Sequence, residues 1–149
     1  MWWYKWRARL SYRLARKLFG KRWAVNNDRI WEWMQGQFAR MAAFNDPAAR
    51  SFYGHLLLHK GQDQPARNEG LRLLGLAANG GEARAAYQLG VHYQDAADPV
   101  AAVHWLELAL QHGHPLAAEK LLQLYDTGGP PETVDVAQAE RVRAHIQFF

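Results

Sequence analysis

The apolar residues of this chain recur at spacings of three and four along most of its length, which is the period of a helix with one buried face. Asn, Asp or Pro stands at the start of most of these segments, and Gly follows several of them, as is typical of helix boundaries. The pattern predicts an all-α protein whose antiparallel helices are joined by short loops. The eight predicted helices cover residues 3–18, 27–44, 47–60, 64–79, 82–94, 99–112, 115–126 and 134–147.

The second half of the chain contains an internal repeat. Shifted by thirty-two positions, the stretch that begins at Gly81 aligns with the stretch that begins at Gly113. The other matching pairs are Ala85 and Ala117, Leu89 and Leu121, and Tyr93 and Tyr125. Because Ala85, Leu89 and Tyr93 are each four residues apart, they share one face of a helix. A fixed period in this range indicates stacked helical repeats, which bury their apolar faces against one another.

Residues 81–113 resemble the Sel-one-like repeat family, a branch of the tetratricopeptide superfamily. The positions that carry the resemblance are Ala85, Leu89, Gly90, Tyr93, Asp98, Ala102, Trp105, Ala109 and Gly113. Residues 46–81 and 113–146 are poorer copies, in which Leu73 and Val142 stand in place of the Trp of the family pattern. The resemblance therefore depends mainly on the central copy and on its recurrence in phase.

The resemblance covers about residues 46–147 and divides the chain into N-terminal helices (residues 1–45) and a repeat region (residues 46–149). It implies a short right-handed α-solenoid of about three repeats, with the N-terminal helices as a cap. It also implies a function: a cytoplasmic scaffold of bacterial type that binds another protein through the concave face of its repeats. The resemblance also leaves a hydrolase as an alternative, because this has been claimed for some Cys-rich relatives, but the absence of Cys and of any nucleophile motif argues against it.

The concave face of such a stack is formed by the first helix of each repeat. The partner-binding residues expected there are Phe52, Leu56, Arg84, Gln88, His92, Lys120 and Leu124. Several of these positions are apolar where an exposed row is usually polar. Either the N-terminal helices cover Phe52 and Leu56, or the row forms an exposed groove for a partner helix or peptide.

Charge is distributed unevenly along the chain. The net charge is +4, but residues 1–27 carry eight basic residues and no acidic residue, so the pI near 9.6 belongs to this segment. Within the predicted helix 3–18, large apolar residues recur at helical spacing, and basic residues occupy the other side. The apolar stripe consists of Trp3, Trp6, Leu10, Leu14 and Leu18.

Three interpretations of the N-terminal helix stay open at this stage. Its apolar stripe caps the repeat stack, or it lies on an anionic membrane, or it binds nucleic acid through the same charges. No recognised nucleic-acid motif accompanies these charges. The residues expected to contact a membrane or another anion are Trp3, Trp6, Arg9, Arg13, Arg16 and Lys17.

The sequence offers little for catalysis or metal binding. His55 and His59 are four residues apart, but the glutamate of the zinc-protease motif is missing between them. His112 and His114 flank a glycine with no third ligand nearby. Serine is rare, and no cysteine is present. We therefore expect no metal, no cofactor and no catalytic site.

The chain contains no apolar run of the roughly 18–20 residues that a spanning helix needs. Arg and Lys interrupt every apolar run through Arg22, which argues against a signal peptide. The expected location is the cytoplasm, with peripheral contact to the inner membrane as an option.

Overall fold

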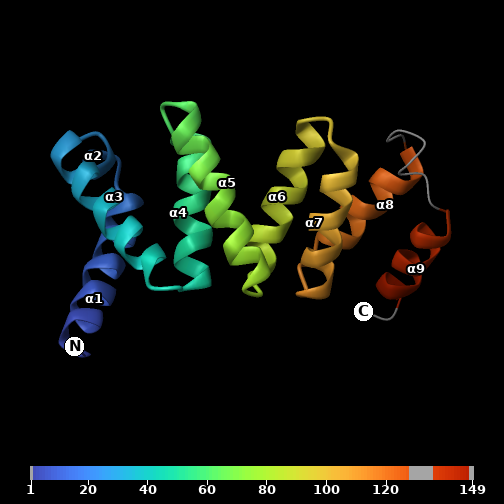
Figure 1. The fold of residues 1–149 in the computed structure, drawn as a ribbon, viewed down its shortest axis with the longest axis horizontal. Coiled ribbons are helices and arrows are strands. Elements are labelled where there is room, and N and C mark those ends of the chain that lie inside the picture. The colour runs from blue at the N-terminus through green and yellow to red at the C-terminus, as the bar shows by residue number, and fades with distance from the viewer. Residues whose placement is uncertain (1, 128–135, 148–149) are drawn as a thin grey trace.

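The computed structural model of the protein describes residues 2–127 and 136–147, with side chains over residues 3–126 and 139–146. Within these ranges the regular structure is entirely helical, with no strand, which confirms the all-α prediction (Figure 1). The helices are α1 (Trp2–Phe19), α2 (Arg22–Val25), α3 (Asp28–Ala43), α4 (Pro47–Lys60), α5 (Gln64–Asn79), α6 (Ala83–Asp95), α7 (Pro99–Gln111), α8 (Ala117–Thr127) and α9 (Val136–Gln147). Helices α1 to α3 lie together at one end of the molecule, and α4 to α9 follow in chain order along its length (Figure 1).

The eight predicted helices are all present, with ends that differ by one or two residues. The start predicted for the last helix, Val134, lies outside the described residues. The sequence pattern misses α2, because a helix of four residues is too short to show a helical period.

Four helices begin with a side chain that caps the free N–H groups of the first turn. The side-chain oxygen accepts a hydrogen bond from the N–H three residues further on, at 2.8 to 3.2 Å. The capping residues are Asn27, Asp46, Asp63 and Asp98. Each cap contributes about 1 kcal/mol. The short polar residues in the loops thus fix where the helices start.

Three helix ends share one turn geometry. Gly81, Ala97 and Gly113 have positive φ angles of 96°, 58° and 81°. At each of them the N–H of the following residue donates to a carbonyl five positions back, at 2.9 to 3.0 Å. This is the Schellman end, which favours Gly at the left-handed position. Ala97 adopts this conformation with a Cβ atom, at a cost of about 1–2 kcal/mol.

From α3 onward each helix packs on the next one, and α1 packs on α3. Two of these crossings are close because one helix presents a glycine. A Cβ atom on Gly54 in α4 would lie 2.8 Å from the carbonyl oxygen of Gly70 in α5. A Cβ atom on Gly90 in α6 would lie 2.5 Å from Cγ of Leu106 in α7. Small residues therefore set the distance between α4 and α5 and between α6 and α7.

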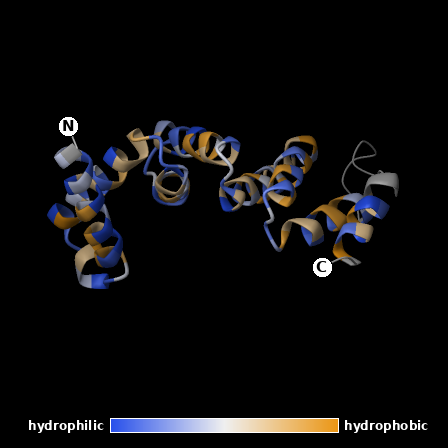
Figure 2. Cartoon of the chain, turned by 90° about the horizontal axis from the view of Figure 1, so that it is seen from below, coloured by the Kyte–Doolittle hydropathy of each residue, from blue (hydrophilic) through white to orange (hydrophobic). Residues whose placement is uncertain are grey.

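The matching positions of the internal repeat form the core of the second half. Ala85, Leu89, Ala102, Ala109, Ala117, Leu121 and Tyr125 are all buried. Trp105 is half-buried and packs against the cluster that includes Leu74 and Leu89. Hydropathy along the ribbon alternates within the helices, as it does in helices with one buried face (Figure 2). The prediction that Leu89 faces inward is confirmed.

The packing of α1 contradicts one prediction. The helix contacts the rest of the molecule through Ala8, Tyr12, Ala15 and Phe19. The predicted packing stripe points to solvent instead, apart from Leu18, which is half-buried. The prediction that this stripe caps the repeat stack is therefore wrong. Ala8 and Ala15 let α1 approach its neighbours closely, and Tyr12 and Phe19 fill the remaining space.

Candidate partner-binding site

A cleft of about 310 Å³ lies where α1, α4 and the start of α6 meet. Its walls collect residues that lie far apart in the sequence. They are Arg16, Phe19, Ala48, Ser51, Phe52, His55, Glu82, Arg84 and Gln88. Three of the residues predicted for the concave face, Phe52, Arg84 and Gln88, meet in this cleft.

Phe52 forms the aromatic wall of the cleft and is held on three sides. Its ring makes edge contacts with Phe19 at 5.5 Å and with Phe38 at 4.9 Å, measured between ring centroids. The guanidinium carbon of Arg16 lies 4.6 Å from the Phe52 centroid, within the range of a cation–π contact. These contacts fix the position of Phe52 before any partner arrives.

Two polar atoms in the cleft are buried without a hydrogen-bond partner. They are Nδ1 of His55 and Oε1 of Gln88. The contact with the Gln88 side chain only partly opposes the lowering of the His55 pKa that burial causes.

The charges of the cleft favour an anion. Burial lowers the pKa of His55, and the neighbouring His59 and Arg84 lower it further, so His55 is neutral at pH 7. The charged groups on the walls are then the guanidinium groups of Arg16 and Arg84 and the carboxylate of Glu82. Arg84 is exposed and makes no ion pair with any residue that the structure describes. The cleft therefore carries a net positive charge.

The remaining predicted partner-binding residues lie outside the cleft. His92 lies further along α6, where its ring contacts Tyr93. Lys120 is half-buried on α8. Leu56 and Leu124 are only 5% and 6% exposed, so neither lines an exposed groove. For Leu56 the structure agrees with the other alternative, in which the N-terminal helices cover it.

Both corrections have a packing cause. Leu56 packs with Ala15 of α1 and with Met34 and Phe38 of α3, so the N-terminal helices cover it. Leu124 belongs to the cluster of α7, α8 and α9, because α8 packs on helices at two sides. Helical spacing predicts one buried face for each helix. It does not predict that a helix such as α4 or α8 packs against neighbours on a second face as well.

Arg16 was predicted to contact a membrane or another anion with Trp3 and Trp6. It lies on the side of α1 that faces Phe52, away from the exposed tryptophans, so of the two only contact with an anion in the cleft fits its position. Ser51 and His55 were missed as lining residues. The sequence did contain a signal for them, because one side of α4 carries four residues at helical spacing: Ala48, Ser51, Phe52 and His55.

Ser51 and His55 lie on the same wall of the cleft, and Nδ1 of His55 makes no hydrogen bond with Ser51 or any other described residue. No group of three or more His, Asp or Glu side chains in the described part of the chain is arranged to hold a metal ion. Among the described helices, none has both the length and the apolar character needed to cross a membrane.

Comparisons of this chain with protein-family models, with curated proteins and with solved structures give no match. The family resemblance consequently stays a hypothesis.

Proposed function

We propose that this protein is a non-catalytic adaptor that binds a segment of another protein in the cleft between α1, α4 and α6. In this proposal the helices from α4 onward form a short right-handed solenoid of about three Sel-one-like repeats, and α1 to α3 close one end of it.

Two helix pairs support the repeat interpretation by their matching contacts. Gly54 meets Gly70 where α4 crosses α5, and Gly90 meets Leu106 where α6 crosses α7. In both pairs the two contacting residues are sixteen positions apart in the sequence. Gly90 of the second pair lies thirty-six positions after Gly54 of the first. The same crossing at the same offset is what stacked copies of one helix pair would produce.

The composition of the cleft carries the functional proposal. The cleft combines an aromatic wall at Phe52, a net positive charge from Arg16 and Arg84, and the polar side chains of His55 and Gln88. Recognition sites for peptides combine an apolar contact with a few polar groups that fix the orientation of the ligand. We therefore expect a short segment with an acidic side chain or a terminal carboxylate next to an apolar residue.

Selection from a displayed random-peptide library on the full-length protein tests this proposal. We expect the selected peptides to carry a carboxylate next to an apolar residue. Arg84→Ala should weaken their binding by at least about tenfold, because a charged hydrogen bond is lost. Arg72→Ala is the matched control, since Arg72 is also exposed but lies on α5 outside the cleft.

Two results would count against the proposal. One is a selection that yields no acidic peptides. The other is a set of peptides whose affinity falls equally with Arg84→Ala and with the Arg72→Ala control.

A further inference from the structure

The helix α1 has two apolar faces, and the molecule uses only one of them. The face that packs inward contains Ala8, Tyr12 and Ala15. Residues two positions apart on a helix point in roughly opposite directions, because each residue turns by about 100°. Leu10 and Leu14, which follow Ala8 and Tyr12 by two positions, consequently point away from the protein.

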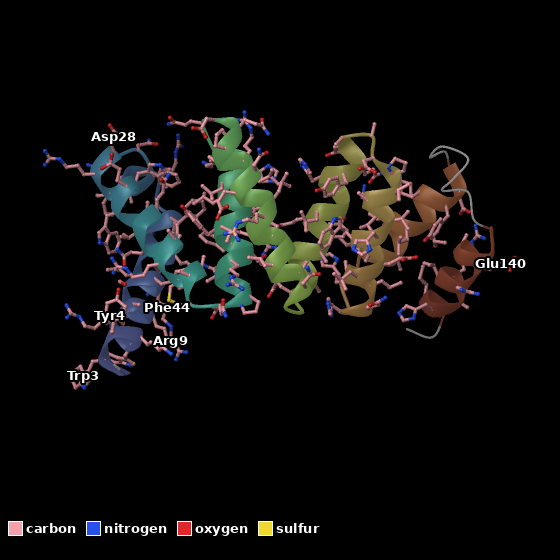
Figure 3. The ribbon with its side chains drawn as sticks, in the orientation of Figure 1. Trp3, Tyr4, Arg9, Asp28, Phe44 and Glu140 are labelled. Carbon is pink, nitrogen blue, oxygen red and sulfur yellow. The ribbon has the colours of Figure 1, made fainter. Side chains whose placement is uncertain are left out.

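The outward face is a continuous stripe of large apolar residues. Trp3, Trp6, Leu10 and Leu14 are 79%, 63%, 56% and 52% exposed. The N-terminal part of α1 extends past the neighbouring helices (Figure 1), and Trp3 points away from the molecule at its end (Figure 3). Tyr4, by contrast, turns back and contacts Phe44 with a centroid distance of 6.0 Å. A connected apolar stripe on a surface marks a contact site.

Basic residues border this stripe on both sides. With 3.6 residues per turn, Arg7 falls on one side of it and Arg9 and Arg13 on the other, and all three are exposed. Lys17 follows at the C-terminal end of the stripe. The helix contains no acidic residue, so none of these charges is neutralised within α1.

We infer that α1 docks on an anionic lipid surface, with the Trp and Leu side chains of the stripe inserted between lipids and the flanking basic residues on the headgroups. The stripe from Trp3 to Leu14 measures about 16 Å along the helix, at 1.5 Å per residue. A helix that lies in the interface buries its apolar face about 5–10 Å deep, and tryptophan is a preferred residue at that depth. The packing of Ala8 and Ala15 holds α1 in place, so the stripe is formed before contact.

The charge and the chemistry of the stripe favour lipid over the other occupants. A second copy of this chain docked through α1 would bring six positive charges against six others, which opposes such a dimer. Nucleic acid would use the basic residues, but Leu10 and Leu14, which form the C-terminal half of the stripe, offer it neither stacking nor hydrogen bonds. An anionic bilayer is complementary both to the apolar stripe and to the basic residues that border it.

Co-sedimentation of the full-length protein with lipid vesicles tests this inference. We expect binding to vesicles of phosphatidylcholine mixed with phosphatidylglycerol and much weaker binding to phosphatidylcholine alone. Leu10→Ser with Leu14→Ser should lower the partition coefficient by at least about tenfold, because the inserted apolar area is lost. The matched control is Val100→Ser with Leu116→Ser, which removes two aliphatic side chains of similar exposure from the repeat region.

A second pair of variants tests the charges. Arg9→Gln with Arg13→Gln should weaken binding to the anionic vesicles by roughly tenfold at low salt. Arg72→Gln with Arg141→Gln removes two exposed charges elsewhere and should have a smaller effect. Circular dichroism and thermal unfolding check that each variant is folded, which we expect because the substituted positions are exposed.

The inference is overturned if the protein does not bind anionic vesicles at low salt, or if the Leu10 and Leu14 pair weakens binding no more than its control pair does. It is also overturned if the protein binds RNA or DNA but not vesicles. A dimer in sedimentation that the two Leu substitutions dissociate, without vesicle binding, would assign the stripe to a second copy instead.

Discussion

Helices α1 to α3 and helices α4 to α8 use their large apolar residues in opposite ways. In α4 to α8, leucine and alanine at helical spacing lie in the core, and exposed aliphatic residues are scattered singly. Among the described side chains of α1 to α3, four tryptophans are exposed, namely Trp3, Trp6, Trp23 and Trp33. Spacing indicates that a helix has an apolar face, but it does not indicate whether the protein or something outside it covers that face.

Small residues explain the difference. The buried face of α1 includes Ala8 and Ala15, and the crossings of α4 with α5 and of α6 with α7 include Gly54 and Gly90. Helices approach closely where side chains are small, so the contact forms on the face that carries them. In this molecule the placement of alanine and glycine distinguishes inner from outer faces better than the placement of tryptophan.

The largest expected effect is at the crossing of α4 and α5. Gly70→Val would place a Cβ atom 2.7 Å from the carbonyl oxygen of Gly54 and from the amide nitrogen of Leu58, both of which are backbone atoms. We expect the free energy of unfolding to fall by about 3 kcal/mol, because the two helices must separate. Urea denaturation followed by circular dichroism measures this change.

The control for this substitution lies in the N-terminal helices. A Cβ atom on Gly36 in α3 meets nothing within 4 Å. Gly36→Ala should raise the free energy of unfolding by about 0.5–1 kcal/mol, because alanine loses less backbone entropy on folding. Equal effects at Gly36 and Gly70 would show that α4 and α5 are not in close contact.

A leucine pair compares the two regions directly. Leu124 is buried on α8 and Leu10 is exposed on α1. We expect Leu124→Ala to lower the free energy of unfolding by about 2–3 kcal/mol and Leu10→Ala to change it by less than about 0.5 kcal/mol. Chemical denaturation of both variants under one set of conditions gives the comparison. A larger loss for Leu10→Ala would mean that the outward face of α1 is packed against the protein.

A smaller effect is expected at the C-terminal ends of α5, α6 and α7. Ala97 has the positive φ angle that Gly81 and Gly113 have at the corresponding turns. Ala97→Gly should raise the free energy of unfolding by about 0.5–1 kcal/mol, since glycine adopts this conformation without strain. Gly81→Ala should lower it. Thermal unfolding of the two variants checks the opposite signs.

The smallest expected effect is on the pH dependence of stability. Burial is the main cause that lowers the pKa of His55 and also that of His114. In the unfolded chain these histidines take up protons near their ordinary pKa of about 6.5, and in the folded protein they do so only at lower pH. The free energy of unfolding therefore falls as the pH drops below about 6.5. Replacement of His55 by Gln should reduce this loss between about pH 7 and pH 5. If the free energy of unfolding of this variant, measured by urea denaturation, depends on pH as it does in the unchanged protein, His55 is exposed to solvent and not buried.

The sequence predicts most of the helices because their boundaries depend on local signals. Asp46, Asp63 and Asp98 cap the starts of helices, and Gly81 and Gly113 end them, and each of these interactions spans only a few residues. The burial of Leu89 and Leu121 is predictable for the same reason, since one helix face determines it. Local chemistry therefore gives the elements and part of the core.

The candidate site was predictable only in part. Phe52, Arg84 and Gln88 were expected on one surface, and they do share a cleft. The contribution of Arg16 was not predictable from spacing, because it depends on how α1 lies across α4. Leu56 shows the same limit, since its burial depends on Ala15 in a helix more than forty residues away.

The central claim is that the large apolar stripe of α1 faces outward, while α4 to α8 bury their apolar faces. Hydroxyl-radical footprinting with mass spectrometry measures this directly, since oxidation of a side chain requires access to solvent. The account predicts rapid oxidation of Trp3 and Trp6 and protection of Phe38 and Leu121. Protection of Trp3 and Trp6 to the level of Phe38 in the lipid-free protein would contradict it.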